Sequence, residues 1–194
     1  MDVPVFYDPM ISKLVAWAED RPRAVARMRR AVDEYLVTGI STTLPFFRWL
    51  LNEPSFIRNI GDRGVRTLEQ ARAYIADGPV VSYARHGFGL YLVELKEPLT
   101  PIGICGVLKR DLLPEPDIGF AFLPAYWSQG YGLESATAVK DYARETLRLP
   151  RLLAIVSPSN EGSIRLLEKL GFSLSSVTRL GPDAPEVKLY TCNL

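Results

Sequence analysis

Residues 122–135 read FLPAYWSQGYGLES, an apolar strand-like run that passes through a glycine-bearing turn into a helical pattern. Backbone N–H groups in the first turn of a helix have no intrahelical partner, and the helix dipole is positive at that end. Gly130 and Gly132 let the backbone approach a ligand closely. The stretch therefore predicts a site for a pyrophosphate.

Two other phosphate-binding loops do not fit these residues. A nucleotide P-loop needs a lysine and a hydroxyl residue after its glycines, but Leu133 and Glu134 follow here. The dinucleotide fingerprint needs a third glycine where this chain has Ser135, and no βαβ pattern surrounds the loop. The loop belongs to another kind of phosphate site.

Apolar runs and the turn residues between them predict both helices and strands, and the three strands within 88–123 read as an antiparallel meander. Thr67 and Gln70 form a capping-box signature for one helix, which Gly78 and Pro79 are expected to end. Helices are predicted at 20–36, 45–52, 68–76, 130–147 and 163–170, and strands at 40–44, 88–95, 101–108, 117–123, 152–157, 173–179 and 187–192.

A second stretch, VSPSNEGSIRLLEKLGF at 156–172, places an asparagine at a helix start and Lys-Leu-Gly-Phe at its end. Together the two stretches resemble the conserved blocks of the GNAT acetyltransferase superfamily. The Tyr-Trp-x-x-Gly-Tyr loop and the run NIGDRG at 59–64 are similar to its ribosomal-protein N-terminal acetyltransferase branch. The resemblance covers about residues 51–194. It implies the GNAT fold, an α/β (α+β) fold in which a mixed, mostly antiparallel central sheet is flanked by helices, preceded here by an N-terminal strand-helix extension.

The resemblance implies direct transfer of an acetyl group from acetyl-CoA, as cosubstrate, to a primary amine at a protein N-terminus or on a small molecule. The pantetheine arm would pair with the strand ending at Leu123, and the thioester carbonyl would accept from a backbone N–H near Phe122 or Leu123. The implied coenzyme-binding residues are Phe122, Leu123, Gln129, Gly130, Tyr131, Gly132, Leu133 and Asn160.

The catalytic residues are less closely defined. Glu115 or Asp117 could supply the base that deprotonates the amine, or both could be turn carboxylates that flank Pro116. The family often places an acidic tyrosine on the last helix, where this chain has Leu167. Ser163 is the alternative acid, or a helix-start residue that binds backbone donors. His86 is read as a loop residue, and no metal site is expected.

Residues 3–17 (VPVFYDPMISKLVAW), 27–31 (RMRRA) and 39–46 (GISTTLPF) instead resemble a fragment of the biotin carboxylase C-terminal subdomain. That family binds its ATP, bicarbonate and biotin elsewhere, so carboxylase activity is not expected. The chain reads as a chimera of an extension at 1–39 and an acetyltransferase-like domain at 40–194, with the seam of the two resemblances near 49–56. A silent coenzyme A binder and a carboxylase-derived interaction module are the alternative functions.

Composition sets the remaining limits. The 194 residues are 47% hydrophobic and carry 23 basic against 22 acidic side chains, which predicts a folded protein with no nucleic-acid or membrane partner. The basic residues of 21–30 are read as a solvated helix face. Cys105 and Cys192 are expected to be buried reduced thiols, and the absence of a leader-like segment predicts a cytoplasmic location. A homodimer stays open.

Overall fold

The structure is a computed structural model that describes residues 19–20, 23, 44–182 and 184–194. The chain divides into two units, residues 1–41 and 42–194. In the described part of the first unit, Arg23 pairs with Glu19 and Asp20. The rest of the basic segment, the helix predicted at 20–36 and most of the strand predicted at 40–44 lie outside the described residues.

The second unit is built on a six-stranded sheet with the order β1-β2-β3-β4-β6-β5. Its strands are β1 (Leu90–Leu95), β2 (Thr100–Leu108), β3 (Asp117–Phe122), β4 (Arg151–Val156), β5 (Ser173–Arg179) and β6 (Glu186–Asn193). The first three form the predicted antiparallel meander. Only β3 and β4 run parallel, and all other pairs are antiparallel. The predicted mixed, mostly antiparallel sheet is confirmed.

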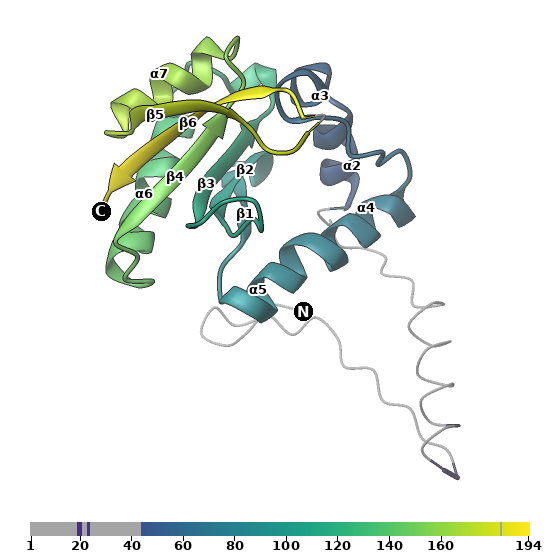
Figure 1. The fold of residues 1–194 in the computed structure, drawn as a ribbon. Coiled ribbons are helices and arrows are strands. Elements are labelled where there is room, and N and C mark those ends of the chain that lie inside the picture. Colours follow the sequence, from purple (N-terminus) through teal and green to yellow (C-terminus); the bar gives the residue numbers. More distant parts are fainter. Residues whose placement is uncertain (1–18, 21–22, 24–43, 183) are drawn as a thin grey trace. The chain divides into compact units, whose positions relative to one another are not determined.

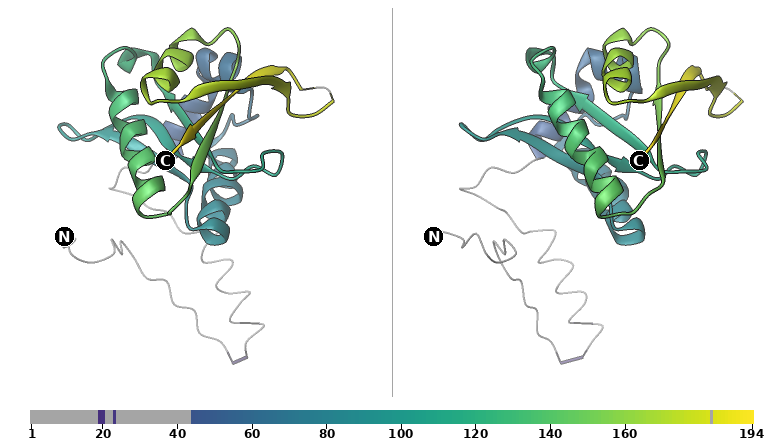
Figure 2. Two further views of the ribbon diagram at one scale, coloured as in Figure 1. Left: turned by 60° about the vertical axis from the view of Figure 1, so that its left-hand side comes forward. Right: turned by 90° about the vertical axis from the view of Figure 1, so that its left-hand side faces the viewer.

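Helices cover both faces of this sheet, as Figures 1 and 2 show. On one face, α6 (Tyr131–Glu145) and α7 (Glu161–Lys169) bury apolar side chains with Cys105, Ile118 and Leu152. On the other face, α2 (Leu44–Asn52), α3 (Pro54–Ile60) and α4 (Leu68–Ile75) pack against Ile104 and Leu123. The alternation of side chains along each strand supplies both apolar faces.

The capping box at the start of α4 is confirmed. The Thr67 hydroxyl accepts from the Gln70 N–H, and the Gln70 side chain accepts from the Thr67 N–H. The same geometry satisfies two of the donors that a helix start leaves unpaired.

The predicted end of this helix at Gly78 and Pro79 was wrong. The chain continues through a π-helical turn, Ala76–Val80, into α5 (Val81–His86), which ends at Gly87 with φ 75°. Pro79 has no N–H to donate, and the wider turn accommodates that loss without breaking the helical path. His86 is consequently the last residue of α5 rather than a loop residue.

Two predictions before α4 also need correction. Leu44, predicted to end a strand, is the first residue of α2. Asn59 and Ile60 complete α3, which lies between the helices predicted at 45–52 and 68–76 and was not among the predicted helices. Pro54 occupies the start of α3, where its missing N–H costs nothing, and Phe56 is buried beneath it.

Candidate active site

The parallel strands β3 and β4 separate along their length. They share a single residue pair, Asp117 with Leu153, where the Leu153 N–H donates to the Pro116 carbonyl at 3.0 Å. No pair joins the later residues of these two described strands, whereas β2 pairs with β3 as far as Phe122. A gap therefore opens toward the carboxyl ends of β3 and β4.

Strand geometry identifies which backbone groups face this gap. The Leu123 N–H donates to the Ile102 carbonyl of β2 at 2.9 Å, so it points away from β4. Backbone groups of successive residues point to opposite edges of a strand. Those of Phe120 and Phe122 consequently face the gap. The sequence left Phe122 and Leu123 as equal candidates for the thioester donor, and the register favours the Phe122 N–H.

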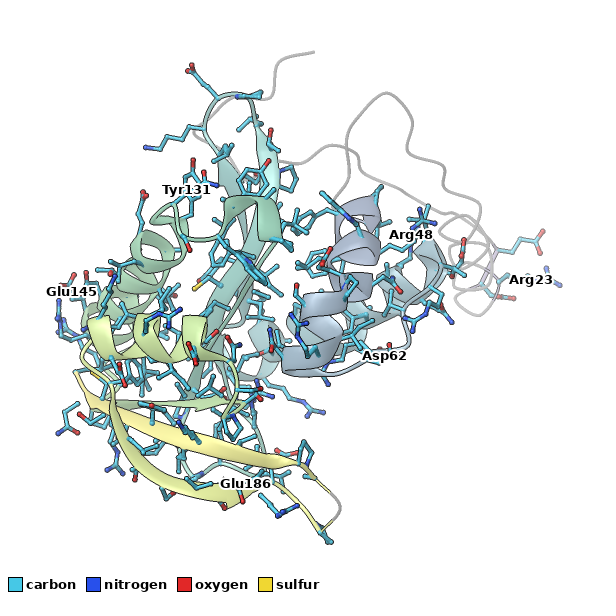
Figure 3. The ribbon with its side chains drawn as sticks, turned by 90° about the horizontal axis from the view of Figure 1, so that it is seen from above. Arg23, Arg48, Asp62, Tyr131, Glu145 and Glu186 are labelled. Carbon is cyan, nitrogen blue, oxygen red and sulfur yellow. The ribbon has the colours of Figure 1, made fainter. Side chains whose placement is uncertain are left out.

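The loop after β3 leads directly into α6. Gly130 precedes the helix with φ 93°, and the first bond within the helix joins the Glu134 N–H to the Gly130 carbonyl at 3.0 Å. The N–H groups of residues 131–133 therefore have no acceptor in the helix. Figure 3 shows Tyr131 at this end of α6 and Glu145 at the other. The Gln129 side chain donates back to the Ala125 carbonyl at 2.6 Å.

The two glycines of the loop have different roles. Gly130 adopts a left-handed conformation that side chains disfavour, and a Cβ there would meet no atom within 4 Å. A Cβ on Gly132 would lie 2.9 Å from Leu166 Cδ1. Both glycines are predicted to let a ligand approach the backbone, and Gly132 also permits the close packing of α6 on α7.

Helix α7 begins at the same edge of the sheet, because β4 runs parallel to β3. Asn160 caps it: its side-chain oxygen accepts from the Ser163 N–H at 3.2 Å. Leu166, in the second turn of α7, packs against Gly132 in the first turn of α6. Ser163 and Asn160 thus lie on the helix beside the predicted pyrophosphate loop.

Leu167, where the resemblance implied an acidic tyrosine, is only 1% exposed within the apolar cluster under α7. It offers no proton. The chain's own residues at this position therefore supply packing alone.

Both candidate bases are engaged by arginines. The Glu115 carboxylate accepts from Arg151 Nε at 2.6 Å and from Arg151 Nη2 at 2.9 Å. The Asp117 carboxylate is fully buried and accepts from Arg110 Nε at 3.0 and 3.1 Å. Burial raises the pKa of Asp117 above its ordinary value, and the Arg110 guanidinium opposes that shift.

These carboxylates lie at the far end of β3 from Phe122. Five residues of extended strand separate Asp117 from Phe122, a length of about 17 Å. Direct proton transfer across that length is excluded, so either carboxylate could act on an amine near Phe122 only through a relay of water molecules.

The loop at 59–64, which resembles the acetyltransferase branch, is held by polar contacts. The Asp62 carboxylate accepts from Arg66 and from the Gly64 N–H, and these bonds lower the pKa of Asp62. Arg66 also donates to the Asn52 side chain at the end of α2. The loop that contains Asp62 is visible in Figure 3.

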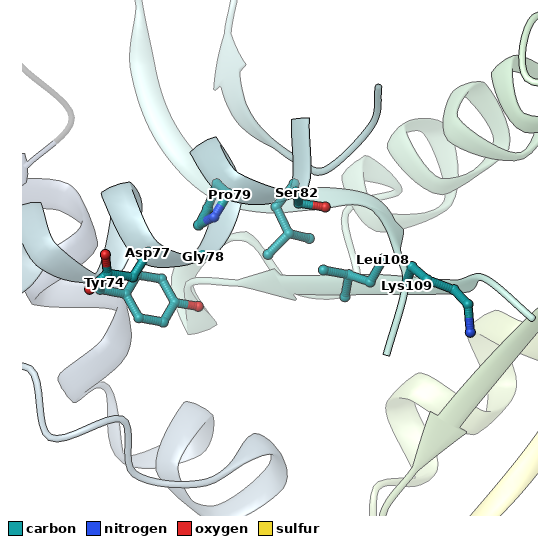
Figure 4. Close-up of a pocket in the computed structure, with 8 residues that line it drawn as sticks. Tyr74, Asp77, Gly78, Pro79, Ser82, Leu108 and Lys109 are labelled. Atoms are coloured by element: carbon teal, nitrogen blue, oxygen red, sulfur yellow. The ribbon is translucent and has the colours of Figure 1, made fainter. Parts of the chain in front are cut away.

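A pocket of about 410 Å³ lies elsewhere, at the start of β1 and the end of β2 (Figure 4). It is lined by Tyr74, Asp77, Gly78, Pro79, Ser82, Leu90, Leu108 and Lys109. Leu108 pairs with Asp117, so this pocket is at the opposite end of β3 from the gap. It is not part of the candidate site.

Within the described residues, no three His, Cys, Asp or Glu side chains are placed to hold a metal ion. Cys105 and Cys192 are buried free thiols, as predicted, and burial raises the pKa of Cys105 to about 12. None of the described helices is long and apolar enough to span a bilayer.

Several residues of the site escaped the sequence analysis. The partners Arg110 and Arg151 lie 7 and 36 positions from the carboxylates that they bind, with no local signal. Gly103 did carry one, because a glycine inside a strand indicates close approach. A Cβ there would lie 2.5 Å from the Phe122 ring.

A gap between parallel strands that ends at a glycine-capped helix start is the arrangement of a protein that binds an extended, phosphate-bearing ligand. The profile of the acetyltransferase (GNAT) domain family matches residues 42–173. The chain therefore belongs to the GNAT acetyltransferase family. A second profile, that of the biotin carboxylase C-terminal domain, matches residues 1–69 and supports the chimeric interpretation.

Curated relatives include carboxylases and an uncharacterized protein. A pyruvate carboxylase polypeptide of Methanothermobacter thermautotrophicus is 46% identical over 57 residues, which are 29% of this chain and 12% of that protein. The uncharacterized protein YkkB of Bacillus subtilis is 30% identical over 96 residues, 48% of this chain and 56% of that protein. The chain thus spans less than two thirds of the length of either relative.

Solved structures match most of the chain. An acetyltransferase from Agrobacterium tumefaciens aligns with a TM-score of 0.64 at 26% identity over 83% of this chain and 99% of that one. A spermidine N-acetyltransferase from Vibrio cholerae, solved with CoA and spermine, gives 0.65 at 15% identity over 81% and 92%. A ribosomal L7/L12 α-N-protein acetyltransferase, solved with coenzyme A, gives 0.66 at 17% over 78% and 89%. The last two likenesses show the fold alone, and with the first they confirm the predicted GNAT fold.

Proposed function

We propose that this chain transfers an acetyl group from acetyl-CoA to a primary amine, at a protein N-terminus or on a small molecule in the cytoplasm. The observation that carries the proposal is the gap between β3 and β4, with the backbone groups of Phe120 and Phe122 facing it and the start of α6 at its mouth. The pantetheine arm would lie along β3, and the pyrophosphate would accept from the amides of residues 131–133.

In this reaction the amine nitrogen attacks the thioester carbonyl, a C–N bond forms and the C–S bond breaks. The Phe122 N–H would stabilise the oxyanion that develops on the carbonyl. The amine proton passes to a base, either water or, through a water relay, Glu115 or Asp117. The leaving thiolate takes a proton for which Ser163 is the candidate donor.

A catalytically silent coenzyme A binder is the second candidate. It is favoured by Leu167, which places a buried apolar side chain where the family often has an acid. Both candidates predict binding, and only the first predicts turnover.

Titration calorimetry with acetyl-CoA tests the binding site common to both. We expect a Gly130→Ala variant to bind acetyl-CoA about tenfold more weakly, because alanine strains the left-handed conformation at that position. Gly78→Ala is the matched control, since Gly78 has open space around it and lies at the opposite end of the sheet. Absence of any heat of binding at millimolar acetyl-CoA would contradict the proposal.

Thiol release from acetyl-CoA on arrays of amines and peptides then separates the two candidates. An enzyme releases thiol in proportion to one class of acceptor. A silent binder gives no release above the acceptor-free rate with any acceptor, although calorimetry still reports binding.

A further inference from the structure

Trp127 lies between the end of β3 and the start of α6. Its indole Nε1–H donates to the Phe122 carbonyl at 2.7 Å. The side chain is 45% exposed, and it belongs to neither of the two apolar clusters of the described residues. Core packing therefore does not explain why an indole occupies this position.

The loop that follows Trp127 has an unfavourable backbone. Ser128 has φ 59° and Gly130 has φ 93°, so two of three consecutive residues are left-handed. A serine in that region persists only where the surrounding structure holds it. Two side chains tie this loop to what precedes it, Trp127 to the Phe122 carbonyl and Gln129 to the Ala125 carbonyl.

We propose that Trp127 is a positioning residue for the phosphates of the coenzyme. Its indole N–H ties the loop to the end of β3 and so holds the amides of residues 131–133 in the orientation that a pyrophosphate needs. The proposal rests on the proposed acetyl-CoA site. It assigns Trp127 to the phosphate end of the ligand, with no part in the transfer step.

The same hydrogen bond also has an effect that opposes coenzyme binding. The Phe122 carbonyl faces the gap, so the indole also occupies an acceptor that the pantetheine arm would use. If that occupation were its main role, removing the indole N–H would improve binding of the arm. The two effects have different signs and act on different parts of the ligand, so one variant separates them.

Trp127→Phe keeps an aromatic ring and removes the N–H. With acetyl-CoA we expect KM to rise about fivefold, the effect of one hydrogen bond, at unchanged kcat. With S-acetylpantetheine, which lacks the phosphates, we expect no change in KM. Trp49→Phe, on the exposed face of α2, controls for loss of an indole. An equal loss with both donors, or a lower KM with S-acetylpantetheine, would overturn the proposal.

A second measurement does not depend on turnover. In the ligand-free protein, we expect the NMR order parameters of the amides of residues 130–133 to fall in Trp127→Phe while the melting temperature stays that of the wild type. Unchanged order parameters would show that the indole does not hold the loop. If the wild type binds no acetyl-CoA, the proposed function fails. The order parameters still decide whether the Trp127 indole holds the loop before α6.

Discussion

At the scale of single residues, two opposing effects act on the pKa of the buried Asp117. Burial favours its neutral form and Arg110 favours its charged form, and the balance raises the pKa above the ordinary value of 3.8. The folded chain then holds this proton more tightly than the unfolded chain does. The stabilising contribution of Asp117 is complete below pH 3.8 and is lost as pH rises through the raised pKa.

Replacing Asp117 with asparagine removes this titration. We expect the unfolding free energy of the wild type, minus that of Asp117→Asn, to decrease as pH rises from below 3.8 and then to level off. Urea denaturation between about pH 3 and pH 7 measures it. Glu115→Gln is the comparison, because that carboxylate is partly exposed. A difference that grows with pH would mean that Arg110 outweighs burial.

The sequence identifies site residues whose role depends on their neighbours in the chain. Gly130 and Asn160 are of this kind, because a left-handed turn and a helix cap are formed within a few residues. The choice between Phe122 and Leu123 as the thioester donor depends instead on residues that are distant in the sequence. It depends on which edge of β3 pairs with β2, and that register is set by the whole sheet.

At the scale of elements, α7 depends on its cap. Asn160→Ala removes the acceptor for the Ser163 N–H, and we expect a loss of about 1 kcal/mol in the free energy of unfolding. Asn160→Asp should retain most of that stability, because aspartate caps helices equally well. Chemical denaturation of the three proteins gives both values.

The same pair of variants shows whether Asn160 also contacts the coenzyme. If capping is its only role, Asn160→Asp binds acetyl-CoA as the wild type does, apart from repulsion between the new carboxylate and the phosphates, which added salt screens. A loss of affinity that persists at high salt would assign the Asn160 amide a direct part in binding.

The long helices and strands were predicted well, whereas the continuation of a helix past Pro79 was not. Turn residues between apolar runs located the meander, the capping box at Thr67 located α4, and a helical pattern followed by Gly171 located α7. Pro79 was read as a helix terminus because its missing N–H breaks an ordinary α-helix. The π-helical turn that absorbs it is stabilised by the continuation into α5, a non-local outcome that residue preferences do not contain.

At the scale of the whole molecule, the two family matches overlap at residues 42–69. We propose that residues 1–39 are a carboxylase-like extension and that 40–194 form the acetyltransferase domain. In this proposal, the seam between the two family resemblances lies near residues 49–56. Asn52 in that interval donates to the Arg48 and Val65 carbonyls and accepts from Arg66. The segment around the seam is therefore joined by hydrogen bonds to the loop before α4.

This arrangement predicts what removing residues 1–41 does. Every residue that we assign to the coenzyme lies between 120 and 163, and the second unit contains the whole sheet and both apolar clusters of the described residues. We therefore expect a chain of residues 42–194 to bind acetyl-CoA within about twofold of the full chain. Calorimetry on both chains, each with its Gly130→Ala variant, measures this. A much larger loss at an unchanged melting temperature would show that residues 1–41 contribute to the coenzyme site, whereas a loss of turnover alone would assign them to the acceptor.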